Sequence, residues 1–544
     1  MLLCYLLTAV IAAPFVCAAP FASRSTSDYP IANTSYGDVL GNTSEYRDGV
    51  YVFKGIPYAA PPTGSARWTA PSKPQSWTDV YNATVFGADC AQTYSSAGIF
   101  SSGSENISED CLYLNVWTPT LNTSESLPVY LWIYGGRFEG GGGDVLTYDG
   151  SGLAIQDIVV VTFNYRLGPF GFLAHPDLSA ESSHNSSGNY GLLDMVAAVE
   201  WVQAEIANFG GDPDHITVGG QSAGSASALD MMYSPLSSGR IAGVISESGA
   251  RGPHDPLTGS LATSHRNKTA AEASGVEFLA AMNVSTIAEL RNLSMDTLLT
   301  EDTLMDAIFE GTRFENLSAF SEPPEWRPVV DGYVLPYTYG EALRSGSHGN
   351  VPILTGNNLD ESGANTDPTM TLESYESTYT DMFEDLASEF FALYPSSNDS
   401  SANGNASNAL WQDISRISTW TWGHDWYTGG ATENVYTYFW THAPPGGRGV
   451  YHGSELYYVF NNIPYADTDL DWTEEDYAIE AVMTVYWANF IKTGDPNGGN
   501  LTEWPVSGDD NTTMFLGDSF GAELVADEAR FELVQKFWTS LIEW

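Results

Sequence analysis

The alternation of short apolar runs with longer amphipathic stretches is the feature that most constrains this chain. Between two of these runs, residues 191–209 carry apolar side chains at helical spacing and are followed by Gly210-Gly211, which predicts a helix that ends at glycine. This alternation is typical of an α/β fold in which helices cover both faces of a large, mostly parallel sheet. Runs rich in Val, Ile and aromatic residues predict strands at 129–134, 158–165, 216–218, 243–246, 351–355 and 435–440.

The length of 544 residues would suggest several domains, but nothing in the sequence divides the chain. No tandem repeat or Pro-rich linker separates independent units. The small polar stretches 179–188 and 396–408 are expected to be exposed loops. We therefore expect one large α/β domain with long insertions over residues 20–544.

The first nineteen residues differ from the rest. Residues 2–16 are apolar except for Thr8 and Pro14, and small residues follow through Ala19, which predicts a secretory signal peptide over residues 1–19. The segment lacks the usual basic residues at its start. A membrane anchor is the alternative, but the run is short for a bilayer span. We expect a secreted, extracellular protein with no stable membrane anchor.

Acceptor motifs for N-linked glycans, Asn-x-Ser/Thr, are dense along the chain and agree with secretion. We expect that glycans occupy only some of them. The acceptor residues are Asn33, Asn42, Asn82, Asn106, Asn122, Asn185, Asn267, Asn283, Asn292, Asn316, Asn398, Asn405, Asn500 and Asn511.

Cysteine usage also agrees with secretion. Cys4 and Cys17 lie in the removable segment, which leaves Cys90 and Cys111 in the mature chain. In an oxidising compartment one disulfide between them is expected, and two unpaired thiols are the alternative.

The charge balance excludes one class of partner. With 20 Lys+Arg against 68 Asp+Glu the formal net charge is -48, which repels phosphate backbones and anionic membrane surfaces. Nucleic acid is therefore excluded as a partner, and we expect a surface that tolerates acid.

One short motif carries nucleophile chemistry. Residues 220–224 match G-x-S-x-G directly after the predicted strand 216–218, with Ser222 at the centre and small residues following. In a sharp strand-to-helix turn the serine hydroxyl stands clear of the sheet edge, and the flanking glycines avoid clashes with neighbouring backbone. A five-residue pattern such as this one also occurs by chance, so the prediction rests on its place between a predicted strand and a predicted helix.

A serine hydroxyl becomes a good nucleophile when a base accepts its proton and a carboxylate orients that base. The reaction also needs N–H donors that stabilise the oxyanion. His452 lies in a loop beyond the strand 435–440, Glu361 just after the strand 351–355, and Gly135-Gly136 just after the strand 129–134. Open α/β sheets build their sites at these carboxyl ends of strands. The order serine, acid, histidine is that of α/β hydrolases.

Competing candidates have simpler explanations. Asp360 is the alternative acid, whereas His424 and His442 are expected to be structural. Trp420, Trp422 and Trp426 are expected to pack as helix residues rather than to line a pocket. Three aspartates at 467, 469 and 471 mimic the start of a calcium loop but lack its Gly and Glu, so we predict no metal site there.

The sequence resembles the type-B carboxylesterase and lipase family, which includes the cholinesterases. Residues 209–224 are similar to the family's serine signature, and residues 109–116 resemble its second signature. The resemblance runs from about residue 30 to the C-terminus, and it suggests a secreted carboxylesterase of the fungal type. Shorter matches occur at residues 53–62, 164–173, 188–194, 329–332 and 493–497.

The resemblance implies the α/β-hydrolase fold with Ser222 as nucleophile, Glu361 as orienting acid and His452 as general base. It also implies that Ser248 supports these residues through hydrogen bonding and that Cys90 pairs with Cys111. No metal or organic cofactor is implied.

For the oxyanion hole, the resemblance implies the backbone N–H groups of Gly136, Arg137 and Ala223. Where the family has a third glycine this chain has Arg137, followed by Phe138. A backbone donor at this position requires a negative φ or a tolerated strain. The side chain of Arg137 is expected to pair with Glu139, and contact with an anionic group on the substrate is the alternative.

The implied activity is hydrolysis of small to medium carboxylic esters through an acyl-serine intermediate, with a small-molecule ester as the partner. A lipase or sterol esterase acting on lipid esters is an alternative that the polar, Ser-rich stretch 91–110 disfavours as a lid. A catalytically silent adhesion homologue is another, and such homologues typically lack the serine or histidine. The sequence leaves acyl and alcohol specificity and the oligomeric state open.

Overall fold

The computed structural model describes residues 29–543 except 94–97, 103, 261–263, 316, 318, 362–363, 365–366, 467–468 and 509. The predicted signal peptide over residues 1–19, the acceptor Asn316 and the first aspartate of the calcium-like turn lie outside the described residues.

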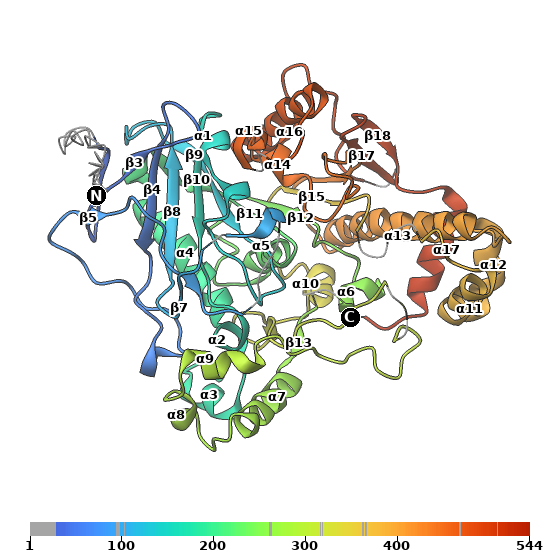
Figure 1. The fold of residues 1–544 in the computed structure, drawn as a ribbon, viewed down its shortest axis with the longest axis horizontal. Coiled ribbons are helices and arrows are strands. Elements are labelled where there is room, and N and C mark those ends of the chain that lie inside the picture. The colour runs from blue at the N-terminus through green and yellow to red at the C-terminus, as the bar shows by residue number, and fades with distance from the viewer. Residues whose placement is uncertain are drawn as a thin grey trace, which may run out of the picture.

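A sheet of eleven strands runs through the molecule (Figure 1). Its seven consecutive strands from β17 to β10 are parallel to their neighbours, whereas the flanking pairs are antiparallel. The large, mostly parallel sheet is therefore confirmed. In spatial order the strands are β18 (Gly521–Leu524), β17 (Thr512–Leu516), β16 (Val435–Trp440), β15 (Ile353–Asn358), β12 (Gly243–Glu247), β11 (Gly211–Gln221), β9 (Leu127–Ile133), β10 (Val159–Phe163), β8 (Tyr113–Thr118), β4 (Tyr51–Pro57) and β3 (Asn42–Thr43).

Both faces of the central strands are covered. Every residue of β10, β12, β15 and β16 is buried, and successive side chains of a strand point to opposite faces. The helix α4 (Tyr190–Glu205) packs on β11, and α5 (Ala223–Tyr233) packs on β11 and β12. The helix α16 (Glu474–Thr493) contacts β9, and α13 (Ser400–Thr428) contacts β15 and β16.

The predicted glycine end of α4 is present with one addition. A 3₁₀ turn over Ile206–Phe209 follows the helix, and Gly210 then takes a φ of +83°, a conformation that favours glycine.

A second apolar cluster lies beyond the sheet. The helices α11 (Leu372–Phe383) and α17 (Glu528–Thr539) pack on α13, and α12 (Ala387–Leu393) packs on α11 and α17, in the orange and red part of Figure 1. At their contact the rings of Phe383 and Phe390 lie 4.5 Å apart and those of Phe383 and Phe537 4.6 Å apart.

Two expected loops are helical in part, so those expectations were wrong. Within 396–408, α13 begins at Ser400, because the Asp399 side chain accepts from the Ser401 N–H at 3.0 Å and caps the helix. Asn403 is fully buried and bonds to the backbone of Ser397 and Met370. Tertiary packing thus overrides the weak helix propensity of a Ser- and Asn-rich segment. Within 179–188, α3 covers the first three residues.

The remaining elements surround this body, and all of them except the 14-residue helix α7 (Lys268–Ala281) are short. The helices are α1 (Ser151–Ala154), α2 (Gly168–Phe172), α3 (Pro176–Glu181), α6 (Pro256–Ser260), α7 (Lys268–Ala281), α8 (Ile287–Leu290), α9 (Met295–Leu298), α10 (Tyr339–Ser345), α14 (Leu456–Val459) and α15 (Ile463–Ala466). The strands are β1 (Ile31–Thr34), β2 (Gly37–Leu40), β5 (Tyr81–Asn82), β6 (Asp89–Cys90), β7 (Ile107–Ser108), β13 (Arg266–Asn267) and β14 (Val329–Val330). None of the described helices is both long and apolar enough to cross a membrane.

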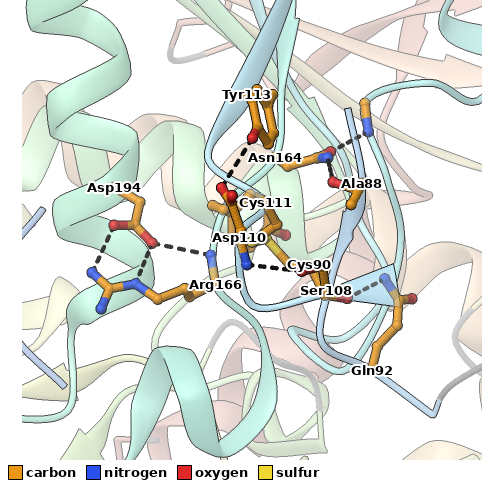
Figure 2. The surroundings of a disulfide bond; sticks show 12 residues. Ala88, Cys90, Gln92, Ser108, Asp110, Cys111, Tyr113, Asn164, Arg166 and Asp194 are labelled. Atoms are coloured by element: carbon orange, nitrogen blue, oxygen red, sulfur yellow. Dashed lines mark hydrogen bonds and ion pairs between the residues drawn. A yellow bond between two sulfur atoms is a disulfide. The ribbon is translucent and has the colours of Figure 1, made fainter. Parts of the chain in front are cut away.

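The expected disulfide joins Cys90 to Cys111 (Figure 2). Beside it, the buried guanidinium of Arg166 pairs with Asp194 at 2.7 Å. The loop that the disulfide closes reaches a distant part of the chain, because a Cβ on Gly453 would lie 2.5 Å from the ring of Phe100. The disulfide therefore constrains a loop that packs beside residue 452.

We predict that replacing both cysteines, in C90A/C111A, lowers the free energy of unfolding. Closing a loop of this length contributes about 3 kcal/mol in the chain-entropy model. Urea unfolding followed by tryptophan fluorescence measures the difference. Reductant should destabilise the wild type and leave the double variant unchanged, and equal unfolding midpoints for the two proteins would contradict the prediction.

Candidate active site

Ser222 occupies a sharp turn between β11 and α5. Its φ of +58° and ψ of -121° are strained for a residue with a side chain. A Cβ on Gly220 would lie 2.3 Å from the carbonyl oxygen of Gly224, and one on Gly224 would lie 2.0 Å from that of Ile133. Only glycine fits at these two positions, so the motif allows the backbone contact that sets the turn. The Ser222 N–H donates to the Glu247 carbonyl at 2.9 Å and fixes the turn to β12.

The structure brings Glu361 and His452 into contact. Glu361 follows β15, His452 follows β16, and Oε2 of Glu361 accepts a hydrogen bond from Nδ1 of His452. The other oxygen, Oε1, accepts from the Asn358 N–H at 2.6 Å and from the Ser248 hydroxyl at 3.1 Å. Ser248 thus lies where the resemblance implies, against the carboxylate of Glu361.

The competing candidates are held elsewhere. Asp360 accepts from the Val450 N–H at 2.8 Å and so ties the backbone before His452 to β15. His442 bonds to Asp476 at 3.0 Å and to Asp518 at 2.6 Å. His424 stacks on Trp420 with ring centroids 5.2 Å apart.

The contact between Glu361 and His452 sets the charge of both groups. Burial alone would raise the pKa of Glu361, but the charge of His452 and its hydrogen bonds hold that pKa below the ordinary value. Desolvation alone would lower the pKa of His452, but the charge of Glu361 and its hydrogen bond raise it. The pair therefore favours an ionised carboxylate that stabilises an imidazolium.

Gln221, the residue before Ser222, contacts the far side of the imidazole. Its Nε2 lies 2.9 Å from Nε2 of His452. With the His452 proton on Nδ1, facing Glu361, the Nε2 lone pair accepts from the Gln221 amide. Within the described residues the Ser222 hydroxyl makes no hydrogen bond to His452, so the amide must release Nε2 before it can take the serine proton. The contact of Gln221 was not predicted from the sequence, which shows only that this residue adjoins the serine in G-x-S-x-G.

The segment after β9 lies against Ser222. A Cβ on Gly135 would lie 3.0 Å from that of Ser222. In the described part of the chain the N–H groups of Gly136, Arg137 and Ala223 donate to no protein acceptor. The three groups implied for an oxyanion hole are thus free for a ligand oxygen.

Arg137 meets its conformational requirement through strain and not through a negative φ. Its φ is +60° and that of Phe138 is +63°. The expected ion pair with Glu139 is present, with Nε of Arg137 3.2 Å from the carboxylate. Nη2 also donates to the Glu322 carbonyl at 3.0 Å. These contacts occupy the guanidinium and hold the strained backbone in place.

A hydroxyl on a strained turn, an imidazole oriented by a carboxylate and free N–H donors can together carry out acyl transfer. The described residues contain no group of three or more His, Cys, Asp or Glu side chains that could hold a metal ion.

Comparisons with known proteins agree with this geometry. The family model described as the carboxylesterase family matches residues 28–528. A fumonisin B1 esterase of Sphingopyxis macrogoltabida is 34% identical over 93% of this chain and 89% of its own length. Carboxylesterase 1D of Rattus norvegicus is 33% identical over 95% of this chain and 94% of its own length.

Among solved structures, the carboxylesterase EST55 of Geobacillus stearothermophilus superposes with a TM-score of 0.74. It is 31% identical, and the match covers 93% of this chain and 99% of that one. The chain therefore belongs to the carboxylesterase family, has the α/β-hydrolase fold, and is a serine hydrolase that acts on carboxylic esters.

Proposed function

We propose that the protein is a secreted carboxylesterase that hydrolyses soluble carboxylic esters through an acyl-serine intermediate. The observation that carries this proposal is the position of His452, whose imidazole lies between the Glu361 carboxylate and the residue that adjoins Ser222. A histidine so placed can move a proton between a serine hydroxyl and a leaving group.

In the first half of the reaction Nε2 of His452 takes the Ser222 proton as the serine oxygen attacks the ester carbonyl. Glu361 keeps the other ring nitrogen protonated and stabilises the imidazolium. The N–H groups of Gly136, Arg137 and Ala223 bind the oxyanion of the tetrahedral intermediate. The imidazolium then protonates the leaving alcohol, and the C–O bond of the ester breaks.

In the second half water replaces the alcohol. His452 takes a proton from the water as its oxygen attacks the acyl carbonyl, and it returns the proton to the Ser222 oxygen as the acid leaves. Ser248 supports both halves indirectly, because its hydroxyl helps to fix the Glu361 carboxylate at 3.1 Å.

The substrate class we propose is a soluble ester of small to medium size. Relatives carry the names fumonisin B1 esterase, para-nitrobenzyl esterase and cocaine esterase, which cover very different esters. The stretch 91–110 is polar and Ser-rich, which disfavours a lipase or sterol esterase with an apolar lid. A catalytically silent adhesion role is disfavoured because the serine, acid and histidine are all present.

The side chains at the acceptor motifs support secretion with N-linked glycans. None of the thirteen described acceptor asparagines is buried and eleven are exposed, whereas seven of the fourteen described asparagines outside such motifs are buried. The acceptors thus lie where a glycan would meet solvent. We further propose that the mature chain, a single domain, begins at residue 20, after the signal peptide.

We predict that a fluorophosphonate labels wild-type protein once, on Ser222. The S222A variant should take no label, and its kcat on a soluble acyl ester should fall by about 10⁶-fold because the nucleophile is lost. Intact mass and peptide mapping measure the label. The S227A variant, which changes a buried serine five residues further on in α5, is the matched control and should still be labelled. A folded wild type without label would overturn the proposed function.

We predict that kcat/KM rises with pH through a pKa above the ordinary histidine value, because only neutral His452 accepts the serine proton and Glu361 raises its pKa. In E361Q the carboxylate charge is absent, so the acid limb of the kcat/KM profile, where activity rises with pH, should move to lower pH. At the same time kcat should fall by about 10⁴-fold. Full pH profiles of both proteins measure the shift. An unmoved acid limb in E361Q would contradict the assignment.

We predict that protein secreted from a eukaryotic host loses mass on treatment with peptide N-glycosidase and begins at residue 20. Deamidation should mark exposed acceptors such as Asn122 and Asn283. Asn350 and Asn434 are exposed outside acceptor motifs and serve as controls that should stay unchanged. An unmodified chain that retains Met1 would contradict both secretion and glycosylation.

A further inference from the structure

Two acidic side chains lie buried behind the residues that the mechanism uses. Glu247 is the last residue of β12, and Glu455 stands just before α14, three residues after His452. Both side chains are completely shielded from solvent. A buried carboxylate is costly unless it is paired or protonated, so their partners decide their charge.

Each carboxyl has one conventional hydrogen bond. The Trp487 indole N–H donates to Oε1 of Glu247 at 3.1 Å, and the Asn358 amide donates to Oε2 of Glu455 at 2.5 Å. The other two oxygens, Oε2 of Glu247 and Oε1 of Glu455, are buried and receive no N–H or hydroxyl donor from the described residues.

The two side chains lie within hydrogen-bonding reach of each other, and the two oxygens without a donor are the ones left to make that contact. Two ionised carboxylates are acceptors only, and their contact would place two negative charges together away from water. A proton on one of the two makes the same contact a hydrogen bond.

We propose that Glu247 and Glu455 share one proton in a carboxyl–carboxylate hydrogen bond, and that this bond holds the segment carrying His452 against the strand that fixes Ser222. This rests on the proposed function, and it makes Glu247 and Glu455 positioning residues. Neither side chain needs to touch the ester.

The backbone and side-chain contacts around the pair explain how it would act. The carbonyl of Glu247 accepts the Ser222 N–H, so one carboxyl belongs to the residue that anchors the serine turn. Asn358 binds Glu455, and the same amide also donates to the Tyr451 carbonyl at 2.8 Å. The Asn358 N–H in turn holds Glu361. The acid pair thus closes a connection between the serine turn, the orienting acid and the histidine segment.

The electrostatics favour a retained proton at neutral pH. Burial and the neighbouring charge of Glu455 raise the pKa of Glu247 well above its ordinary value, and burial raises the pKa of Glu455 to about 7. The charged groups that face the pair are Glu361 and His452. The positive charge of Arg251 acts on those two groups and favours a lower pKa for both Glu361 and His452.

The tyrosines around the pair come from three further elements. Tyr130 on β9, Tyr148 before α1 and Tyr438 on β16 have a pKa raised by burial and then by the charge of the glutamates, so they stay neutral and leave the pair's charge uncompensated. When the pH rises far enough to remove the shared proton, two negative charges face each other and the segment of residues 453–456 is repelled from β12. Activity should therefore fall on the alkaline side as this proton is lost.

The test replaces the shared proton with a permanent donor. In E247Q or E455Q the amide N–H can donate to the remaining carboxylate at any pH, and the amide oxygen can keep the bond from Trp487 or Asn358. The buried net charge stays at one negative, so the acid limb of kcat/KM should stay in place. The alkaline limb should move up by about one pH unit or more, because no proton can be lost from the contact.

E480Q is the matched control. Burial raises the pKa of Glu480 to about 7, and its side chain accepts from the Ile463 N–H at 2.9 Å. Among the described residues the charge that acts on Glu480 is that of Arg47 and not that of a second carboxyl. The E480Q variant should leave both limbs of the kcat/KM profile where the wild type has them. Alkaline limbs of E247Q and E455Q that coincide with the wild type would overturn the proposal.

Leucine at either position removes the hydrogen bond and separates positioning from packing. In E247L and E455L kcat should fall about 100-fold with little change in KM. The imidazole would no longer be held in the orientation that proton transfer needs, whereas the residues that bind the ester are unchanged. The amide variants should restore most of this loss. Unchanged kcat in both leucine variants would also overturn the proposal.

Infrared spectroscopy tests the shared proton without any assay. At neutral pH the wild type should show the carbonyl band of a buried protonated carboxyl group that E247Q and E455Q both lose. The E480Q variant should keep this band and lose only the contribution of Glu480 itself. If this band is found but no ester is hydrolysed, the acid pair stands and the proposed function fails. If esters are hydrolysed and the band is missing, the acid pair alone fails.

Discussion

The close approach of α5 to the end of β9 is the constraint on which the site depends. A Cβ at Gly224 would lie 2.0 Å from the Ile133 carbonyl oxygen, so the helix can begin there only because that side chain is absent. The turn before this contact has Ser222 at a φ of +58°, and the contact brings the first N–H groups of α5 beside the glycine segment after β9. Nucleophile and oxyanion donors therefore share one packing contact, while the base and its carboxylate reach the same edge from β16 and β15, which lie beyond β12 in the sheet.

The strands could be predicted closely where they are wholly buried. Residues 435–440 were predicted without error, and 243–246 lacked only Glu247, because uninterrupted apolar and β-branched side chains mark a strand covered on both faces. The polar start of β11 was missed since Asp212, Asp214 and His215 carry no such pattern. The start of α13 was missed because a cap and buried asparagine bonds hold it, and neither shows in composition.

At the site, the sequence could indicate the residues that carry a motif but not those that act through contacts. Strand ends and chain order pointed to Ser222, Glu361 and His452, and the resemblance to the family gave them their roles. The structure places the three residues at one edge of the sheet. Gln221 and Glu455 lie close in the chain to two of these residues, yet nothing in their spacing shows which way they point. The acid at position 247 did leave a signal, since a charged residue ending a fully buried strand needs a partner. That partner is 208 residues away in the chain.

Arg137 ties the oxyanion segment to a remote stretch of the surface. Its guanidinium donates to the Glu322 carbonyl, which belongs to a segment that supplies none of the reacting groups. The strained φ of +60° persists only while such contacts outweigh the cost of the conformation. A substitution that moves the backbone at residue 322 would remove this hydrogen bond, and with it one of the contacts that hold the oxyanion segment in its strained conformation. Turnover therefore depends on a segment that supplies no reacting group.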